Sequence, residues 1–172
     1  MKIKIKKYII PFMIVMCVLL IYTHNLGEVI IEMENNSGKS PIESVEEEIV
    51  INQSFNVKSK KLAGIAIQFG TYMRENVGHV QLNLYNNKNI KLASARVSKK
   101  NLEDNQFYEW YFPPISTLLN NEFRLEIILQ NDGENNQVTL YKNNDVDAQQ
   151  LELQVNGEKV EGALNFKIYS IK

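Results

Sequence analysis

The stretch GIAIQFGTYMRENVGHVQLNLY, residues 64–85, decides the fold class of this chain. Both of its ends alternate between apolar and more polar residues, and a period of two is typical of β-strands with one buried face. The apolar positions are Ile65, Ile67, Phe69, Val80, Leu82 and Leu84. A polar hinge, TYMRENVG at residues 71–78, separates the two runs. We interpret this hinge as the connection of a β-hairpin, in which Gly78 suits a position with positive φ.

The same alternation recurs along the rest of the chain, between turns rich in Asn, Asp and Gly. It predicts further strands at residues 53–57, 91–97, 108–112, 123–130, 137–141, 151–155 and 164–168. Asn156 and Gly157 form a strong hairpin signal. Sheets with one apolar face bury those faces by packing against each other. We therefore predict an all-β fold, an antiparallel β-sandwich of eight or nine strands, with a jelly roll as the specific topology.

Residues 1–27 form a separate N-terminal segment. Four lysines, Lys2, Lys4, Lys6 and Lys7, precede 15 uncharged residues at 8–22. A basic flank before an apolar block is typical of an export signal or a membrane anchor. Fifteen helical residues rise only about 22 Å against about 30 Å of hydrocarbon, which favours a cleavable signal. No Ala-x-Ala-like triplet follows the block, which favours an uncleaved transmembrane or signal-anchor helix.

Charge predicts how the chain is oriented and divided. All four lysines precede the apolar block, so the positive-inside rule places the N-terminus in the cytoplasm. Residues 28–47 are acidic and polar, and we expect them to be a flexible spacer. Residues 48–172 then form an extracytoplasmic β-sandwich at the cell membrane, or a secreted one if the signal is cleaved.

The composition of the predicted sandwich excludes some classes of function. Residues 48–172 contain 14 Lys and Arg and 14 Asp and Glu, so their net charge is zero and we expect no nucleic-acid partner. They contain no cysteine, because the single cysteine of the chain is Cys17. The sandwich therefore has to be stabilised by burial of a core without disulfides.

The residues of common hydrolytic sites are scarce. His79 is the one histidine of residues 48–172, and no Gly-x-Ser-x-Gly motif accompanies it. Glu109 and Glu126 fall at mid-strand on polar faces, where carboxylates are usually solvated or paired across strands. We expect no enzyme, and keep a hydrolase only as the weaker alternative.

Two groups of residues are candidate ligand contacts. In the hinge, Arg74 is suited to bind a carboxylate or phosphate, with Tyr72 and Asn76 beside it; the alternative is that these residues only build a turn. Tyr85 and Tyr111 fall on the outward parity of their strands, as do two further tyrosines, Tyr141 and Tyr169. Outward tyrosines on one sheet form a platform for sugars; the alternative is ordinary packing across strands.

The order of these segments resembles a known family. Segments QSF, LAGIAIQFGTYMRENVGHVQLNLY, LEDNQFYEWYFPPI, FRLEI and VNGEKVEGALNFKIYS follow one another as in galactose-binding-like jelly-roll modules of bacterial membrane-bound envelope proteins. The resemblance covers about residues 50–170. Modules of this kind occur in proteins of surface-polysaccharide synthesis, including some glycosyltransferases. The resemblance implies a carbohydrate-binding β-sandwich, and it implies calcium as a structural cofactor of such modules. Among the oxygen-rich loops, Asp145 and Asp147 are the best calcium candidates.

From these observations we expect a membrane-tethered module that binds carbohydrate of the cell envelope. The alternative is a protein-protein interaction module that docks onto a membrane partner, such as a polysaccharide synthase or glycosyltransferase, through a sheet face or edge.

Trypsin added to intact cells that express the full chain is expected to release the C-terminal domain, because the lysine distribution places that domain outside. Immunoblotting of the medium and of the cell pellet measures the release, with lysed cells as the control. Protection of the domain until the cells are lysed would contradict this topology.

Overall fold

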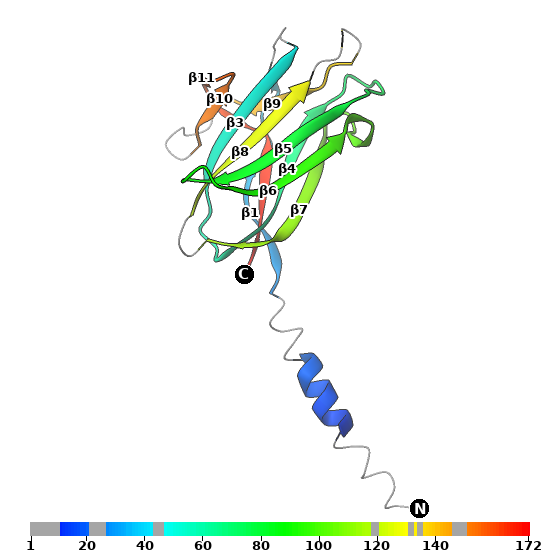
Figure 1. Ribbon diagram of the computed structural model, residues 1–172, viewed down its shortest axis with the longest axis vertical. Coiled ribbons are helices and arrows are strands. Elements are labelled where there is room, and N and C mark those ends of the chain that lie inside the picture. The colour runs from blue at the N-terminus through cyan, green and yellow to red at the C-terminus, as the bar shows by residue number, and fades with distance from the viewer. Residues whose placement is uncertain are drawn as a thin grey trace, which may run out of the picture.

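The structure is a computed structural model that describes residues 11–20, 27–42, 47–117, 121–130, 133, 136–145 and 151–172. It confirms an all-β fold of two antiparallel sheets, preceded by a helix at residues 11–20 (Figure 1). Among the described residues, no helix has both the length and the apolar character needed to span a membrane.

One sheet has seven strands. They are β1 (Val29–Asn35), β2 (Ser40–Pro41), β4 (Lys61–Gly70), β7 (Gln106–Ser116), β9 (Thr139–Asn143), β12 (Ala163–Leu164) and β13 (Phe166–Ile171). Their order is β1-β13-β4-β9-β12, while β7 pairs with β4 and β2 pairs with β9. Strand β4 is the centre of this sheet, since it pairs with β13, β7 and β9.

The other sheet has six strands. They are β3 (Glu48–Asn56), β5 (His79–Asn86), β6 (Lys91–Ser98), β8 (Glu122–Gln130), β10 (Leu153–Val155) and β11 (Glu158–Val160). Their order is β11-β10-β3-β8-β5-β6, and a short 3-10 helix, η1 (Lys99–Asn101), follows β6. The strands β3, β8, β5 and β6 lie side by side across the front of the molecule (Figure 1).

The two sheets share one apolar core. Burial alternates along β8, where Phe123, Leu125, Ile127 and Leu129 are buried and the residues between them are not. The ring of Phe55 on β3 lies 5.9 Å from that of Phe123 and 6.0 Å from that of Phe166 on β13, so aromatic packing joins the sheets. Trp110 of β7 is also buried in this core.

A buried amide also connects the sheets. Gln53 of β3 is fully buried, and its Oε1 accepts a hydrogen bond of 2.8 Å from the backbone N–H of Leu164 on β12. Its Nε2 donates to the backbone oxygens of Ser54 and Glu152. Because these bonds satisfy the whole amide, a polar side chain is tolerated at an inward position of β3.

The hairpin predicted at Asn156 and Gly157 is confirmed. These two residues connect β10 to β11, with Val155 opposite Glu158. Both have positive φ, 50° and 83°, as a two-residue type I′ turn requires. The Asn156 side chain also accepts a hydrogen bond from the backbone N–H of Val50 on β3.

The hinge at residues 71–78 is not a hairpin, and this prediction is wrong. Strand β4 before it belongs to the seven-stranded sheet, and β5 after it belongs to the six-stranded sheet. The hinge therefore carries the chain from one sheet to the other. Alternation predicted both flanking strands correctly, but a period of two does not indicate which strand pairs with which.

The expected spacer at residues 28–47 is corrected as well. Residues 29–35 form β1, which pairs with β13 along its length, and Ser40–Pro41 forms β2 beside β9. Asn35 is buried, and its Nδ2 donates to the backbone oxygen of Leu164 at 2.6 Å. The acidic side chains are accommodated because Glu34 pairs with Lys167 and Glu32 accepts bonds from the loop before β4. The sandwich thus begins before residue 30, and short strands bring the total above the eight or nine predicted.

A chain that begins at residue 48 is expected to be less stable than one that begins at residue 27, by more than about 2 kcal/mol, because β13 loses its partner β1 and the buried bonds of Asn35. Urea unfolding measures the difference, with the full chain as the reference. Equal unfolding midpoints for the two shortened chains would show that residues 27–47 are dispensable for folding.

Candidate functional site

The outer face of the six-stranded sheet carries a continuous set of polar side chains. Register places Asn52 of β3 opposite Glu126 of β8, Glu126 opposite Asn83 of β5, and Asn83 opposite Ser94 of β6. These residues alternate with core residues along their strands, so their side chains point away from the core. We call Asn52, Glu126, Asn83 and Ser94 the central polar row.

Hydrogen bonds hold the central polar row flat on the sheet. Glu126 Oε1 accepts bonds from Asn83 Nδ2 at 2.9 Å and from the Tyr85 hydroxyl at 3.1 Å. The Ser94 hydroxyl donates to Asn83 Oδ1 at 2.9 Å. Asn83 is only 3% exposed in consequence, although it lies on the outer face. The carboxylate of Glu126 is therefore held in one orientation by two side chains of β5.

Arg124 lies beside this row and is positioned from several sides. Its guanidinium carbon is 4.4 Å from the centre of the Tyr85 ring, a cation–π distance. Its NH1 donates to Asn52 Oδ1 at 2.5 Å and lies 3.5 Å from Glu126 Oε2, while NH2 donates to Asn89 Oδ1 at 3.2 Å. Because these contacts fix the guanidinium of Arg124, its remaining N–H donors point in a fixed direction.

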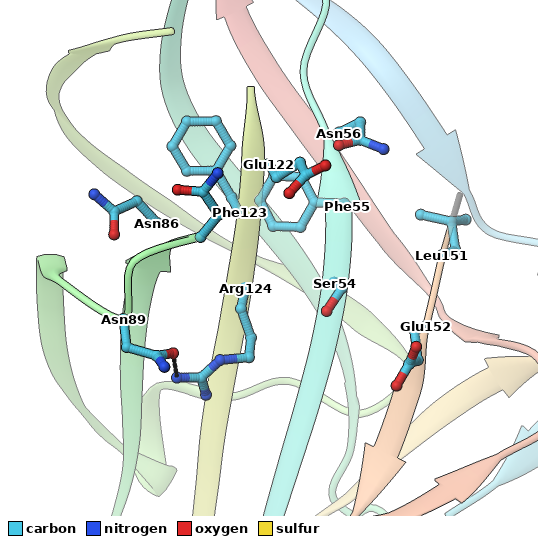
Figure 2. Close-up of a pocket in the computed structure, with 11 residues that line it drawn as sticks. Ser54, Phe55, Asn56, Asn86, Asn89, Glu122, Phe123, Arg124, Leu151 and Glu152 are labelled. Atoms are coloured by element: carbon cyan, nitrogen blue, oxygen red, sulfur yellow. Dashed lines mark hydrogen bonds between the residues drawn. The ribbon is translucent and has the colours of Figure 1, made fainter. Parts of the chain in front are cut away.

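A hollow of about 390 Å³ opens next to Arg124, at the end of the sheet where β3 ends and β8 begins. Figure 2 shows Asn86, Asn89 and Arg124 on one side, Leu151 and Glu152 on the other, and Ser54 between Arg124 and Glu152. Ser54, Asn56 and Glu122 complete its polar wall. We call this space the Arg124 hollow. It combines hydrogen-bond donors and acceptors from several elements, as a site for a small polar ligand requires.

The structure separates the tyrosines that were expected to form one platform. Tyr85 lies on the outer face of the six-stranded sheet, beside Arg124. Tyr111 lies on the seven-stranded sheet, next to Tyr169 with 5.1 Å between ring centres. Tyr85 and Tyr111 therefore cannot contact the same small ligand.

Tyr169 shows why outward parity did not predict exposure. It lies opposite Gly64 of β4, which has no side chain, and Tyr111 lies opposite Gly64 on the other side. The two rings close over the glycine, and Tyr169 is only 7% exposed. Its hydroxyl donates to Glu109 Oε1 at 2.8 Å. Burial, followed by the nearby Glu109 carboxylate, raises the pKa of Tyr169 far above its ordinary value, so this hydroxyl stays protonated.

The candidate contacts of the hinge build the crossover between the sheets. Arg74 lies over the ring of Tyr72, with 5.0 Å from its guanidinium carbon to the ring centre. Asn76 is only 1% exposed, and its Nδ2 donates to the backbone oxygens of Thr71 and Arg74. Tyr72 and Met73 both have φ of 56°, a region that side chains with Cβ rarely adopt. They are 50% and 91% exposed.

Two side chains fasten the ends of this crossover. Asp104 accepts a hydrogen bond of 2.6 Å from the backbone N–H of Thr71. Asn136 binds the backbone of Val77 twice, since its Oδ1 accepts from the N–H at 2.5 Å and its Nδ2 donates to the oxygen at 2.8 Å. The buried Lys99 donates from Nζ to the backbone oxygen of Asn136 and so supports it. The unusual backbone at Tyr72 and Met73 is thereby held in place from both ends.

The pair of carboxylates weighed for hydrolysis is also divided. Glu109 lies on β7 of the seven-stranded sheet and Glu126 lies on β8 of the six-stranded sheet, both on outer faces. They therefore cannot act on one bond. His79 is exposed at the start of β5, and its Nδ1 lies 3.4 Å from an Arg96 nitrogen.

The calcium site stays a prediction. Asp145 is exposed, and its backbone N–H binds the side chain of Asn143. Asp147 lies outside the described residues. Within the described part of the chain, no three His, Cys, Asp or Glu side chains are grouped so that they could hold a metal ion.

Sequence reasoning missed the residues that surround Tyr85. Arg124, Asn52, Asn83 and Asn89 were not among the candidates, because each is a common surface residue and they come from separate strands and loops. The available signal was the outward parity of Arg124 and Glu126 in the segment FRLEI, which also predicted the burial of its apolar residues.

Asn136→Ala is expected to lower the free energy of unfolding by about 1–3 kcal/mol, because it leaves the N–H and oxygen of Val77 without their side-chain partner. Urea unfolding measures this change, and hydrogen exchange at residues 71–78 measures the loosening of the crossover. Glu75→Ala, at an exposed position of the same crossover, is the control and should change neither. Unchanged exchange in Asn136→Ala would mean that Asn136 does not fasten the crossover.

Comparisons with known proteins add no further assignment. No protein-family model matches this chain, and no curated protein matches it. The resemblance to galactose-binding-like modules therefore stays a prediction. What this chain can bind has to be inferred from its own surface, where the hollow, the stacked arginine and the fixed carboxylate lie together.

Proposed function

We propose that this protein is a binding module that recognises carbohydrate at the Arg124 hollow. The observation that carries the proposal is the stacking of Arg124 on Tyr85 at the wall of a polar hollow. Sugars present hydroxyl groups that donate and accept, around an apolar ring face. Asparagine amides, carboxylates and a fixed guanidinium in the hollow match the hydroxyls.

Pre-organisation supports the same ligand class. Asn52, Tyr85, Asn89 and Glu126 already hold Arg124, so a ligand does not have to order this side chain when it binds. The hollow carries both signs of charge, because Glu122 and Glu152 line it together with Arg124. A neutral ligand with many hydroxyls suits that balance better than a strongly anionic one.

The proposal places this module at the cell envelope, tethered to the membrane by residues 1–27. Its support is the sequence pattern of four lysines before 15 uncharged residues. A jelly roll is the proposed topology of the sandwich, by its resemblance to galactose-binding-like modules. The proposed role is binding without catalysis.

A second candidate function is docking onto a membrane protein, and the crossover between the sheets favours it. Tyr72, Met73 and Val77 are exposed together on a segment whose ends are fastened by Asp104 and Asn136. Exposed apolar side chains on a rigid loop are typical of protein contacts. The partner would bind the crossover and leave the outer face of the six-stranded sheet free.

Arg124→Ala and Tyr85→Ala in the full chain are each expected to weaken binding on an array of cell-envelope glycans about tenfold or more, because either change removes the stacked pair. Tyr111→Ala, which truncates an exposed tyrosine on the other sheet, is the matched control and should bind like the unchanged protein. Circular dichroism verifies that each variant is folded.

Two outcomes would contradict the proposal. One is the absence of binding to every glycan by the folded, unchanged protein. The other is equal loss of binding in Tyr111→Ala and Tyr85→Ala. Crosslinking of the crossover to a membrane protein in cells, lost in Met73→Ser, would instead support the docking function.

A further inference from the structure

A second hollow lies on the same outer face as the Arg124 hollow. It measures about 270 Å³ and is lined by Glu48, His79, Gln81, Arg96, Ile128 and Gln130. Register aligns these residues across the four strands, with Gln81 opposite both Ile128 and Arg96, and Glu48 opposite Gln130. We call it the Arg96 hollow. Like the Arg124 hollow, it combines an arginine, a carboxylate and side-chain amides.

The central polar row lies between the two hollows, together with Val50 of β3 and Tyr85 of β5. Along β8 the Arg124 hollow ends at Arg124, the row contributes Glu126, and the Arg96 hollow begins at Ile128. The side chains of the row lie close to the sheet, because Asn83 is almost fully buried and the Glu126 carboxylate is hydrogen-bonded to Asn83 and Tyr85.

Hydrogen bonds continue from the row into the Arg96 hollow. Gln81 donates from Nε2 to the Ser94 hydroxyl at 2.8 Å, and it lies 3.3 Å from Asn83 Oδ1. Polar side chains are therefore linked without interruption from Arg124 through Glu126, Asn83 and Ser94 to Gln81. A ligand that crosses the row meets hydrogen-bonding groups from Arg124 to Gln81.

We infer that the outer face of the six-stranded sheet binds a linear oligosaccharide that runs along β8 and occupies both hollows. This inference rests on the proposed carbohydrate function and extends it from a single sugar to a chain. The seven residues from Arg124 to Gln130 span about 20 Å, which exceeds the length of one sugar ring. Both hollows carry mixed charge, so the ligand class is an uncharged chain with many hydroxyl or amide groups.

The test compares short and long oligomers of one sugar. Isothermal titration calorimetry is carried out on the full chain in nanodiscs, with β-1,4-linked oligomers of glucose and of N-acetylglucosamine that contain two or six units. In the series that binds, the hexamer is expected to bind about tenfold or more tightly than the dimer, because it reaches both hollows.

Variants separate the two hollows. Arg96→Ala is expected to remove the advantage of the hexamer and to leave dimer binding unchanged. The reason is that Arg96 lines the Arg96 hollow and not the Arg124 hollow. His79→Ala, at another residue of that hollow, should have the same effect. Unchanged dimer binding also shows that both variants are folded. Lys100→Ala, an exposed cation outside both hollows, is the control and should behave like the unchanged protein.

The outcomes distinguish this inference from the function on which it rests. Equal affinity for dimer and hexamer would overturn the inference and leave carbohydrate binding intact. A hexamer advantage that survives in both Arg96→Ala and His79→Ala would overturn it as well. If no oligomer of either series and no glycan of the array binds, the proposed function fails together with the inference.

Discussion

Burial of two apolar sheet faces against each other is the interaction on which the rest of this structure depends. The chain has a single cysteine, Cys17, which precedes the sandwich, so no disulfide joins the sheets. Packing of Phe55 on Phe123 and Phe166 makes the contact instead, and Gln53 adds a buried hydrogen bond between the layers. About 0.8 kcal/mol is gained for each buried methylene group, so many modest contacts replace a covalent link.

That burial also determines which residues are free to bind. Each strand of the six-stranded sheet gives every second side chain to the core and leaves the others outside. On β8 the inward set is apolar, while Arg124 and Glu126 are among those left on the outer face. Because β8 lies between β3 and β5, its outward side chains meet those of both neighbours and are oriented by them. The same strand thus stabilises the core and positions the proposed ligand contacts.

The sequence predicted what depends on local alternation and missed what depends on pairing. It predicted the long strands and the turn at Asn156 and Gly157. It did not predict that the hinge crosses between sheets, or that residues 29–35 join a sheet, since their stability comes from distant partners such as β13. The same limit applies to the site: Tyr85 was found by parity, but its partnership with Arg124 needed the register of β5 and β8.

The central claim is that the outer face of the six-stranded sheet is the ligand-binding face of this protein. Hydrogen–deuterium exchange of the full chain, with and without a saturating cell-envelope polysaccharide, tests it most directly. The account predicts added protection in β3, β5, β6 and β8 and in the loop from Asn86 to Ile90, with β7 and β13 unchanged. Protection confined to the crossover at residues 71–78, or to the seven-stranded sheet, would contradict it.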